Sequence, residues 1–163
     1  MYQIGERVVY GVHGVCQILE LQVQIVNRKK VEYYVLEPVR QPGARYFVPS
    51  QNQVAVSKLR PMLSKTEILD LLGSHRVKET VWIDDENQRR IYYKDLLTEG
   101  DRAGLLTMIR TLYVHKEQQA QLGKKFHMTD ANFLKDAEKV LFSEFSMVLD
   151  IPYEKMVEYI SQL

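Results

Sequence analysis

The stretch RVVYGVHGVCQI, residues 7–18, decides the fold of the N-terminal part of the chain. It contains two short runs rich in Val, Ile and Tyr, residue types that favour the pleated, half-buried surface of a β-sheet. Gly11 and Gly14 lie between the runs, and glycine tolerates the positive φ angles of a tight turn. The stretch therefore predicts the opening hairpin of a small β-barrel.

Further β-strands are predicted as far as residue 56, because apolar and polar residues alternate and polar turns separate the runs. A second strand continues from Gln17, and Asn27-Arg28-Lys29-Lys30 forms a turn. The later strands are predicted at residues 31–39, 44–49 and, closing the sheet, 54–56. Strands this short bury little surface in an open sheet, so we expect an SH3-like or Tudor-like barrel over residues 1–57.

The apolar periodicity becomes helical after Pro61, which predicts an α+β protein of two domains. Residues 58–63 are the predicted linker, and residues 64–163 an all-α bundle of four or five helices. The expected helix starts are a Ser64-x-x-Glu67 capping box, the acidic run Asp84-Asp85-Glu86, Asp101, Thr129 or Asp130, and Asp150-Ile-Pro152.

Composition and charge indicate an ordinary cytoplasmic protein. The 163 residues have a net charge of +1 and no apolar run near the ~18 residues of a membrane span. The N-terminus lacks the basic and apolar regions of a signal peptide, and the single Cys16 forms no internal disulfide. Residues 1–60 carry eight Lys and Arg against four Asp and Glu, whereas residues 61–163 carry fourteen against seventeen. This asymmetry indicates different partners for the two halves.

No pattern for enzyme chemistry, a metal or another cofactor is present. His13, His75, His115 and His127 lie far apart and lack other ligands at metal-site spacing. A structural or solvent-facing role is favoured for His13 over a ligand role. The acidic run 84–86 is more typical of a helix cap than of a metal site. No phosphate loop or nucleophile elbow occurs, so we expect a binding protein rather than an enzyme.

Trp82, the one tryptophan, lies between two predicted helices and has two interpretations. In the first, which the sequence favours, it fills the seam between the helices. In the second, it is an exposed wedge beside a DNA base step, and Arg89, Arg90 and Lys94 contact the phosphates. The acidic run after Trp82 opposes the second interpretation.

A binding edge is predicted on the sheet. Arg45, Tyr46 and Phe47 are expected beside an edge strand at residues 23–26, where unpaired backbone groups could receive a strand from a partner. The alternative is ordinary core packing for every second residue.

An ordered set of short motifs spans nearly the whole chain and resembles the CarD/CdnL family of bacterial transcription regulators. The motifs are Gly5-x-x-Val8-Val9-Tyr10-x-x-His13-Gly14-Val15, Glu32-Tyr33-Tyr34-Val35-Leu36, Phe47-Val48-Pro49, Trp82, Arg89-Arg90 and Gly100-Asp101. The first sixty residues are also similar to the RNA-polymerase-interacting domain of the transcription-repair coupling factor.

The resemblance implies a barrel that docks on the lobe of the RNA polymerase β subunit. It also implies a helical domain that contacts promoter DNA at the upstream edge of the melted bubble. Trp82 would match the family's minor-groove wedge, and Arg89 and Arg90 its basic neighbours. Some relatives carry polymerase-contacting arginines where this chain has Gln24 and Phe47. The resulting polymerase-binding set is Gln24, Val26, Arg45 and Phe47.

The first hypothesis is therefore a non-enzymatic regulator that binds polymerase through its barrel and tunes open-complex stability through its helical domain. Tethering to polymerase would make a weak, sequence-independent minor-groove contact effective. The rival hypothesis is a protein-only interaction module with no DNA contact. Neither requires a membrane, a cofactor or a small-molecule substrate.

Overall fold

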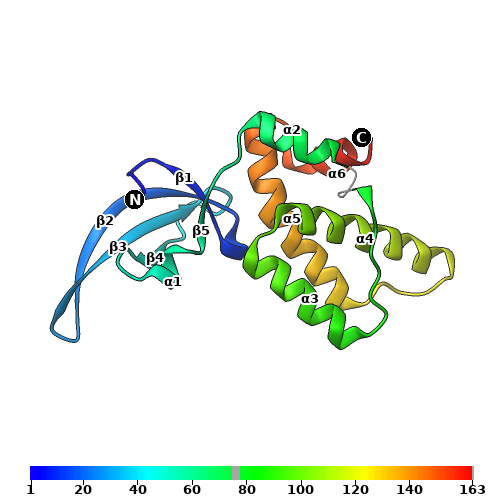
Figure 1. Ribbon diagram of the computed structural model, residues 1–163, viewed down its shortest axis with the longest axis horizontal. Coiled ribbons are helices and arrows are strands. Elements are labelled where there is room, and N and C mark those ends of the chain that lie inside the picture. Colours follow the sequence, from blue (N-terminus) through cyan, green and yellow to red (C-terminus); the bar gives the residue numbers. More distant parts are fainter. Residues whose placement is uncertain (75–77, 163) are drawn as a thin grey trace. The chain divides into compact units, whose positions relative to one another are not determined.

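The computed structural model describes residues 1–74 and 78–162 and separates into two compact units, Met1–Met62 and Leu63–Leu163 (Figure 1). The first unit contains a five-stranded antiparallel sheet, and the second consists of helices and their connections. The predicted α+β class is therefore confirmed. His75, one of the histidines considered above, lies outside the described residues.

The first unit is built on the predicted opening hairpin. Strand β1 (Arg7–Tyr10) pairs with β2 (Val15–Val26) through a 3₁₀ turn, η1 (Gly11–His13). Gly11 and Gly14 both have positive φ angles, of 47° and 76°, as the turn prediction requires. The remaining strands are β3 (Lys29–Pro38), β4 (Tyr46–Pro49) and β5 (Leu59–Pro61), and the order across the sheet is β4-β3-β2-β1-β5.

Strands β2 and β3 form a long hairpin that extends beyond the rest of the sheet (Figure 1). Its turn residues Asn27 and Arg28 have φ angles of 51° and 65°, the signature of a two-residue turn with both central residues left-handed. Pairing with β3 continues to Val26, whereas pairing with β1 covers only Val15–Gln17. The far part of β2 therefore has a partner strand on one side only.

The strand predicted at the end of this unit is wrong. Residues 54–56, expected to close the sheet, lie in the short helix α1 (Gln53–Val56), because the Asn52 side chain accepts a hydrogen bond from the Ala55 backbone and caps the turn. The closing strand is β5, which falls inside the predicted linker 58–63. It pairs with β1, and Leu59 is buried in the core of the sheet.

A cluster of buried side chains in the first unit lies on one face of the sheet. Its buried members are Val8, Cys16, Ile18, Tyr34, Leu36, Val48 and Leu59. Fully burying such a side chain stabilises the fold by about 1.5–3 kcal/mol. Cys16 contributes as a small apolar side chain within this core.

The second unit contains five α-helices within the described residues: α2 (Lys65–Gly73), α3 (Glu86–Glu99), α4 (Arg102–Gln121), α5 (Met128–Leu149) and α6 (Met156–Ser161), the last preceded by the 3₁₀ turn η3 (Tyr153–Lys155). The predicted capping box is confirmed, because Ser64 and Glu67 exchange side-chain and backbone hydrogen bonds at the start of α2. Asp85 caps α3 through the backbone of Gln88. Helix α5 is central, since it packs against each of the other four helices.

A buried carboxylate joins three parts of the second unit. Glu144 on α5 is 1% exposed and accepts hydrogen bonds from Arg102 Nε at 2.7 Å and Nη2 at 2.8 Å. Its Oε2 also accepts the Leu63 backbone N–H at 2.9 Å. The first residue of the unit, the start of α4 and the middle of α5 are thus held together by one side chain.

In the part of the chain that the structure describes, no helix combines the length and the apolar character needed to cross a membrane. Over the same residues, no group of three or more His, Cys, Asp or Glu side chains is arranged to hold a metal ion.

Candidate interaction sites on the sheet and beside Trp82

The strand register places three of the predicted polymerase-binding residues on one face of the sheet. Gln24 pairs with Val31, Val26 with Lys29, and Phe47 with Val35. Residues directly opposite one another point to the same face, and positions two apart along a strand share it. Gln24, Val26 and Phe47 therefore lie on a common face, here called the Gln24 face, which also carries Val31 and Tyr33.

The Gln24 face is the side of the sheet opposite the buried cluster around Ile18, although Val35, the partner of Phe47, is also buried on it. Phe47 is 46% exposed, and its ring meets Tyr33 edge-on at a centroid distance of 6.2 Å. Val31 and Tyr33 are half-buried, and Val26 is exposed. Because exposed aromatic and branched side chains gather here, this face can offer apolar contact area to a partner.

The opposite face continues the core outward along the β2–β3 hairpin. Leu21, Val23 and Ile25 alternate on the core side, and their exposed fractions rise from 42% through 57% to 76% towards the turn. The rise occurs because pairing with β1 ends at Gln17, which leaves the outer edge of β2 without a strand. An edge of this kind is suited to pairing with a strand from another protein.

The prediction that Arg45, Tyr46 and Phe47 lie beside residues 23–26 is wrong. Strand β4 pairs with β3, and β3 separates it from β2. Val31 and Val35, the partners of Gln24 and Phe47, are four residues apart on β3, or about 13 Å at the usual strand rise. The sequence does not show this separation, because it does not tell which strands pair with each of the two sides of β3.

Arg45 is held by the loop that precedes β4. Its Nη1 donates to a Glu37 carboxylate oxygen and to the Ala44 carbonyl, and the Gly43 backbone N–H donates to the same Glu37 oxygen at 3.0 Å. The Gly43 and Arg45 hydrogen bonds lower the pKa of the Glu37 carboxyl group. The guanidinium of Arg45 thus makes its contacts within the loop, although its side chain remains 41% exposed.

Trp82 lies in the second unit and is held by three contacts. Its indole N–H donates to Asp84 Oδ1 at 3.0 Å, and its ring stacks on His115 of α4 at 3.6 Å with an interplanar angle of 15°. The guanidinium carbon of Arg89 lies 4.4 Å from the ring centre, a cation–π distance. Trp82 is half-buried, and these contacts join it to α3 and α4 rather than to the two helices that flank it in the sequence.

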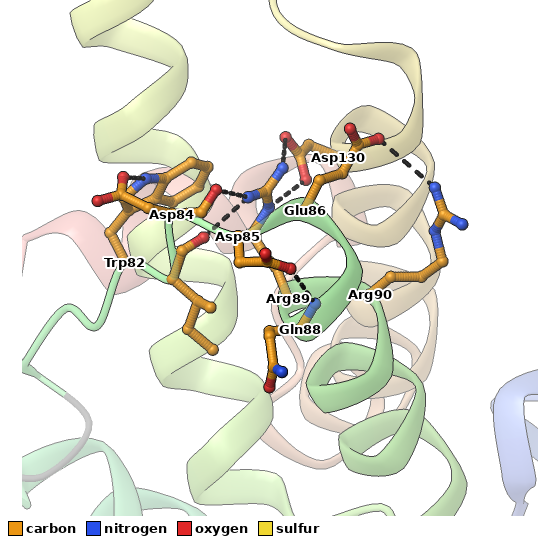
Figure 2. A network of polar contacts seen from close by, with 9 residues as sticks. Trp82, Asp84, Asp85, Glu86, Gln88, Arg89, Arg90 and Asp130 are labelled. Atoms are coloured by element: carbon orange, nitrogen blue, oxygen red, sulfur yellow. Dashed lines mark hydrogen bonds and ion pairs between the residues drawn. The ribbon is translucent and has the colours of Figure 1, made fainter.

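Arg89 faces the interior of the second unit, which disfavours the phosphate contact predicted for it. It is 6% exposed and forms a two-pronged ion pair with Asp130 of α5, Nε–Oδ1 at 2.9 Å and Nη2–Oδ2 at 3.2 Å. Its Nη1 donates to the backbone carbonyls of Ile83 and Asp84 (Figure 2). A signal existed in the sequence, because Arg89 is four residues before Tyr93 and seven before Leu96, on the buried stripe of α3.

Arg90 and Lys94 remain accessible on α3. Figure 2 shows Arg90 directed away from Arg89 and towards Glu86, with which it makes a 3.5 Å contact at a side-chain exposure of 43%. Lys94 is exposed and one helical turn further on, so the two cations share a helix face. An exposed ion pair as long as Arg90–Glu86 stabilises the protein by at most about 1 kcal/mol, so Arg90 can readily leave Glu86 and bind another anion.

A basic loop near the Trp82–His115 stack was missed by sequence reasoning. Phe126, in the connection between α4 and α5, lies 6.3 Å from the His115 ring and 6.0 Å from Lys116 Nζ. Lys124 and Lys125 directly precede Phe126 and are exposed. The Lys-Lys pair after the end of α4 was a visible signal, but its proximity to a tryptophan some forty residues earlier depends on how α4 and α5 pack.

The pKa of His115 is lowered chiefly by burial. Arg89 and His127 lower it further, whereas Asp130 and Asp84 oppose the shift. The neutral imidazole is therefore favoured in the folded protein relative to the unfolded chain, whose histidine pKa is near 6.5. Below that pH the unfolded chain binds more protons than the folded protein, so stability falls as the pH decreases.

We expect His115→Phe to reduce this acid sensitivity. Phe can stack on Trp82 but does not titrate, so the urea midpoint of the variant should fall less than that of the wild type between about pH 7.5 and pH 5.5. Trp82 fluorescence follows the unfolding of this unit. His13→Gln, which changes a histidine of the first unit and keeps every group that acts on His115, is the control and should retain the wild-type slope. Equal slopes for all three proteins would contradict the assignment to His115.

The first unit can now be compared with known families. Residues 2–60 match the CarD-like/TRCF RID domain. RID stands for RNA-polymerase-interacting domain, so the predicted similarity of the first sixty residues to that domain is confirmed. No curated protein gives a significant match to the chain. The match includes β1 to β4 and the beginning of β5.

The RID-like region contains one of the two candidate sites. Gln24, Val26 and Phe47 fall inside it, whereas Trp82, Arg90 and Lys94 lie outside it, in the helical unit. The match therefore bears on polymerase interaction by the sheet. The assignment of the whole chain to the CarD/CdnL family, and of the helical unit to DNA, remain predictions.

Proposed function

We propose that this protein is a non-enzymatic transcription regulator that binds the lobe of the RNA polymerase β subunit through its RID-like sheet, curved as a Tudor-like barrel, and contacts upstream promoter DNA through its helical unit. The observation that carries the polymerase half is the RID match over residues 2–60. The placement of Gln24, Val26 and Phe47 on one exposed face supports a docking role for that region.

The Gln24 face and the free edge of β2 make different kinds of contact with the polymerase. The edge beyond Ile18, whose own backbone groups are bonded to Gly5 and Glu6, supplies backbone N–H and C=O groups to a strand of the lobe. Phe47 and Val26 supply apolar contacts, since this chain has Gln24 and Phe47 where a more basic relative would use charge. Binding of this kind should depend weakly on salt, because few ion pairs are formed.

The DNA contact is proposed for the accessible part of Trp82 and the cations around it. Arg90 and Lys94 on α3, with Lys124 and Lys125 in the basic loop, would hold phosphates beside the ring. Arg89 instead stiffens the site from within by its pair with Asp130. The second half of the chain is net acidic, so its own affinity for DNA should be low and should become effective only on polymerase.

The polymerase half is tested by titrating the full-length protein against core RNA polymerase. Phe47→Glu is expected to weaken binding by about thirtyfold or more, because an exposed aromatic anchor of an interface typically contributes about 2 kcal/mol or more. Val54→Glu is the matched control: it places the same charge at another exposed apolar residue of the first unit, on α1. Equal affinities for the two variants would exclude the Gln24 face as the docking surface.

The DNA half is tested by the lifetime of the open promoter complex at saturating regulator. Trp82→Ala and the double variant Arg90→Ala/Lys94→Ala are expected to reduce the regulator's effect by about fivefold or more while polymerase binding is retained. The double variant changes only surface residues, so an effect in it does not arise from the loss of packing around His115 that Trp82→Ala causes. Wild-type lifetimes with both variants would remove DNA contact from the proposal.

A protein-only module remains the second candidate, favoured by a specific observation. Asp84, Asp85 and Glu86 are exposed next to Trp82, and carboxylates at this place would repel a phosphate backbone. In that case the helical unit would bind another protein while the sheet binds polymerase. Protection of upstream promoter DNA that weakens steeply with added salt would count against this candidate.

A further inference from the structure

A groove in the second unit is not used by the proposed function. It lies between α4, α5 and α6, with a volume of about 510 Å³. The floor is formed by buried Leu106, Ile109, Phe142 and Ile160. A volume of this size and a mostly apolar lining with few polar groups are typical of small-molecule sites.

The groove follows the length of α4. Its lining extends along that helix from Leu106 to Ala120, a distance of about 21 Å at the helical rise. A carbon–carbon bond of about 1.5 Å gives a zigzag chain an advance of about 1.25 Å per atom, so about 17 carbons would span the same length. The groove is therefore long enough to hold an extended alkyl chain.

One cation on the groove wall has no polar partner among the residues that the structure describes. Arg110 is half-buried, and no hydrogen bond or ion pair joins its guanidinium to another of the described residues. Glu117 also lines the groove but is seven residues further along α4, about 10 Å away along the axis. A guanidinium held against apolar surface favours an anion that it can bind in two-pronged fashion, as it binds a carboxylate.

We propose that this groove binds a single-chain amphiphile with an anionic head, its alkyl chain lying along α4 between Ile109 and Ile160 and its carboxylate paired with Arg110. The unpaired guanidinium calls for one negative group at a fixed position beside a long apolar channel. A fatty acid meets both requirements with one molecule. The apolar face of a protein helix would fill the floor but would leave Arg110 unmatched unless it also carried an acid at that point.

The test uses the full-length protein and a dansyl-labelled undecanoate as the fluorescent probe, displaced by dodecanoate or by dodecanol below their aggregation limits. Wild-type protein should prefer dodecanoate to dodecanol by about tenfold, the usual value of a charge-assisted hydrogen bond. Arg110→Gln should reduce that preference to less than about twofold while keeping the affinity for dodecanol. Loss of the preference on removing either charge identifies the Arg110–carboxylate contact.

Two valine variants separate the groove from general surface binding. Val114→Glu places an acid at an exposed rim position of the groove and should abolish probe binding. Val81→Glu makes the same change at an exposed valine outside the groove lining and should bind as the wild type does. Circular dichroism confirms that both remain folded.

Other outcomes would overturn the proposal. Equal loss of binding in the two valine variants, or wild-type displacement curves in Arg110→Gln, would exclude this groove as the site. Sedimentation with phosphatidylglycerol vesicles without binding of free dodecanoate would show association with a lipid surface instead. Failure of dodecanoate, dodecanol and vesicles to bind would leave a protein helix as the occupant and refute a small-molecule site.

Discussion

Replacing Asp130 by Asn is expected to destabilise the second unit by about 3–5 kcal/mol, the usual cost of removing one partner from a buried ion pair. The substitution keeps the shape of the side chain and removes its charge. Arg89, with a side-chain exposure of 7%, would then be left in the interior without a counter-charge. Asp130 also lies in the first turn of α5, where a negative charge is favoured by the helix dipole.

Urea unfolding followed by Trp82 fluorescence measures this loss, because the only tryptophan contacts Arg89 directly. Asp136→Asn, at an exposed aspartate of the same helix, is the matched control and should change stability by less than about 0.5 kcal/mol. The double variant Arg89→Met/Asp130→Leu should recover much of the loss, since apolar pairs often replace buried ion pairs without cost. A loss below about 1 kcal/mol for Asp130→Asn would show that the pair behaves as an exposed one.

The second large effect is expected at Glu144, where Glu144→Gln should cost about 3 kcal/mol. Its carboxylate accepts hydrogen bonds from Arg102 Nε, Arg102 Nη2 and the Leu63 N–H. A glutamine amide has the same shape, but its NH₂ group is a donor and would face at least one of these N–H groups. Arg102 retains 18% side-chain exposure, so water relieves part of the unpaired charge and the cost should be smaller than at Asp130.

Glu138→Gln is the matched control for Glu144→Gln on the same helix. Burial raises the pKa of Glu138, against the effects of Tyr113 and Lys116, and Tyr113 donates a hydrogen bond to its carboxylate. A neutral amide oxygen also accepts that bond, more weakly, but the substitution removes the cost of partly burying a charge, so the control should be close to neutral. Thermal unfolding of both variants decides between them. Equal midpoints would mean that Glu144 does not join Leu63, α4 and α5 in solution.

The elements that sequence reasoning placed correctly depend on signals within a few residues. The Gly11 and Gly14 turn, the Ser64–Glu67 capping box and the acidic start of α3 at Asp85 each involve groups close along the chain. At residues 54–56, where the strand was wrongly predicted, and at β5, which lies within the predicted linker 58–63, the local pattern of apolar residues does not decide the structure. Three apolar-rich residues fit a strand or one helical turn equally well, and β5 forms only because β1 offers it a partner.

In the candidate sites, too, the sequence identified single residues, whereas the tertiary structure brought them together. Gln24 and Phe47 were chosen separately from the sequence, and the register of β3 with both neighbours places them on one face. Trp82 was recognised as unusual, but its stack on His115 joins residues more than thirty positions apart. The groove containing Arg110 had no sequence signal, because its walls come from three helices whose apolar residues resemble ordinary core.

Arg89 and Arg90 illustrate the difference between what local sequence patterns predict and what tertiary packing decides. Local sequence patterns alone predict that both arginines belong to a helix with an acidic start, and that an antiparallel sheet comes before the helices. Adjacent residues on a helix point about 100° apart, so only one of the two arginines can face the interior. Which one does so was decided by the packing of α3 against α5, where Asp130, 41 residues after Arg89, provides the counter-charge that makes burial of a guanidinium favourable.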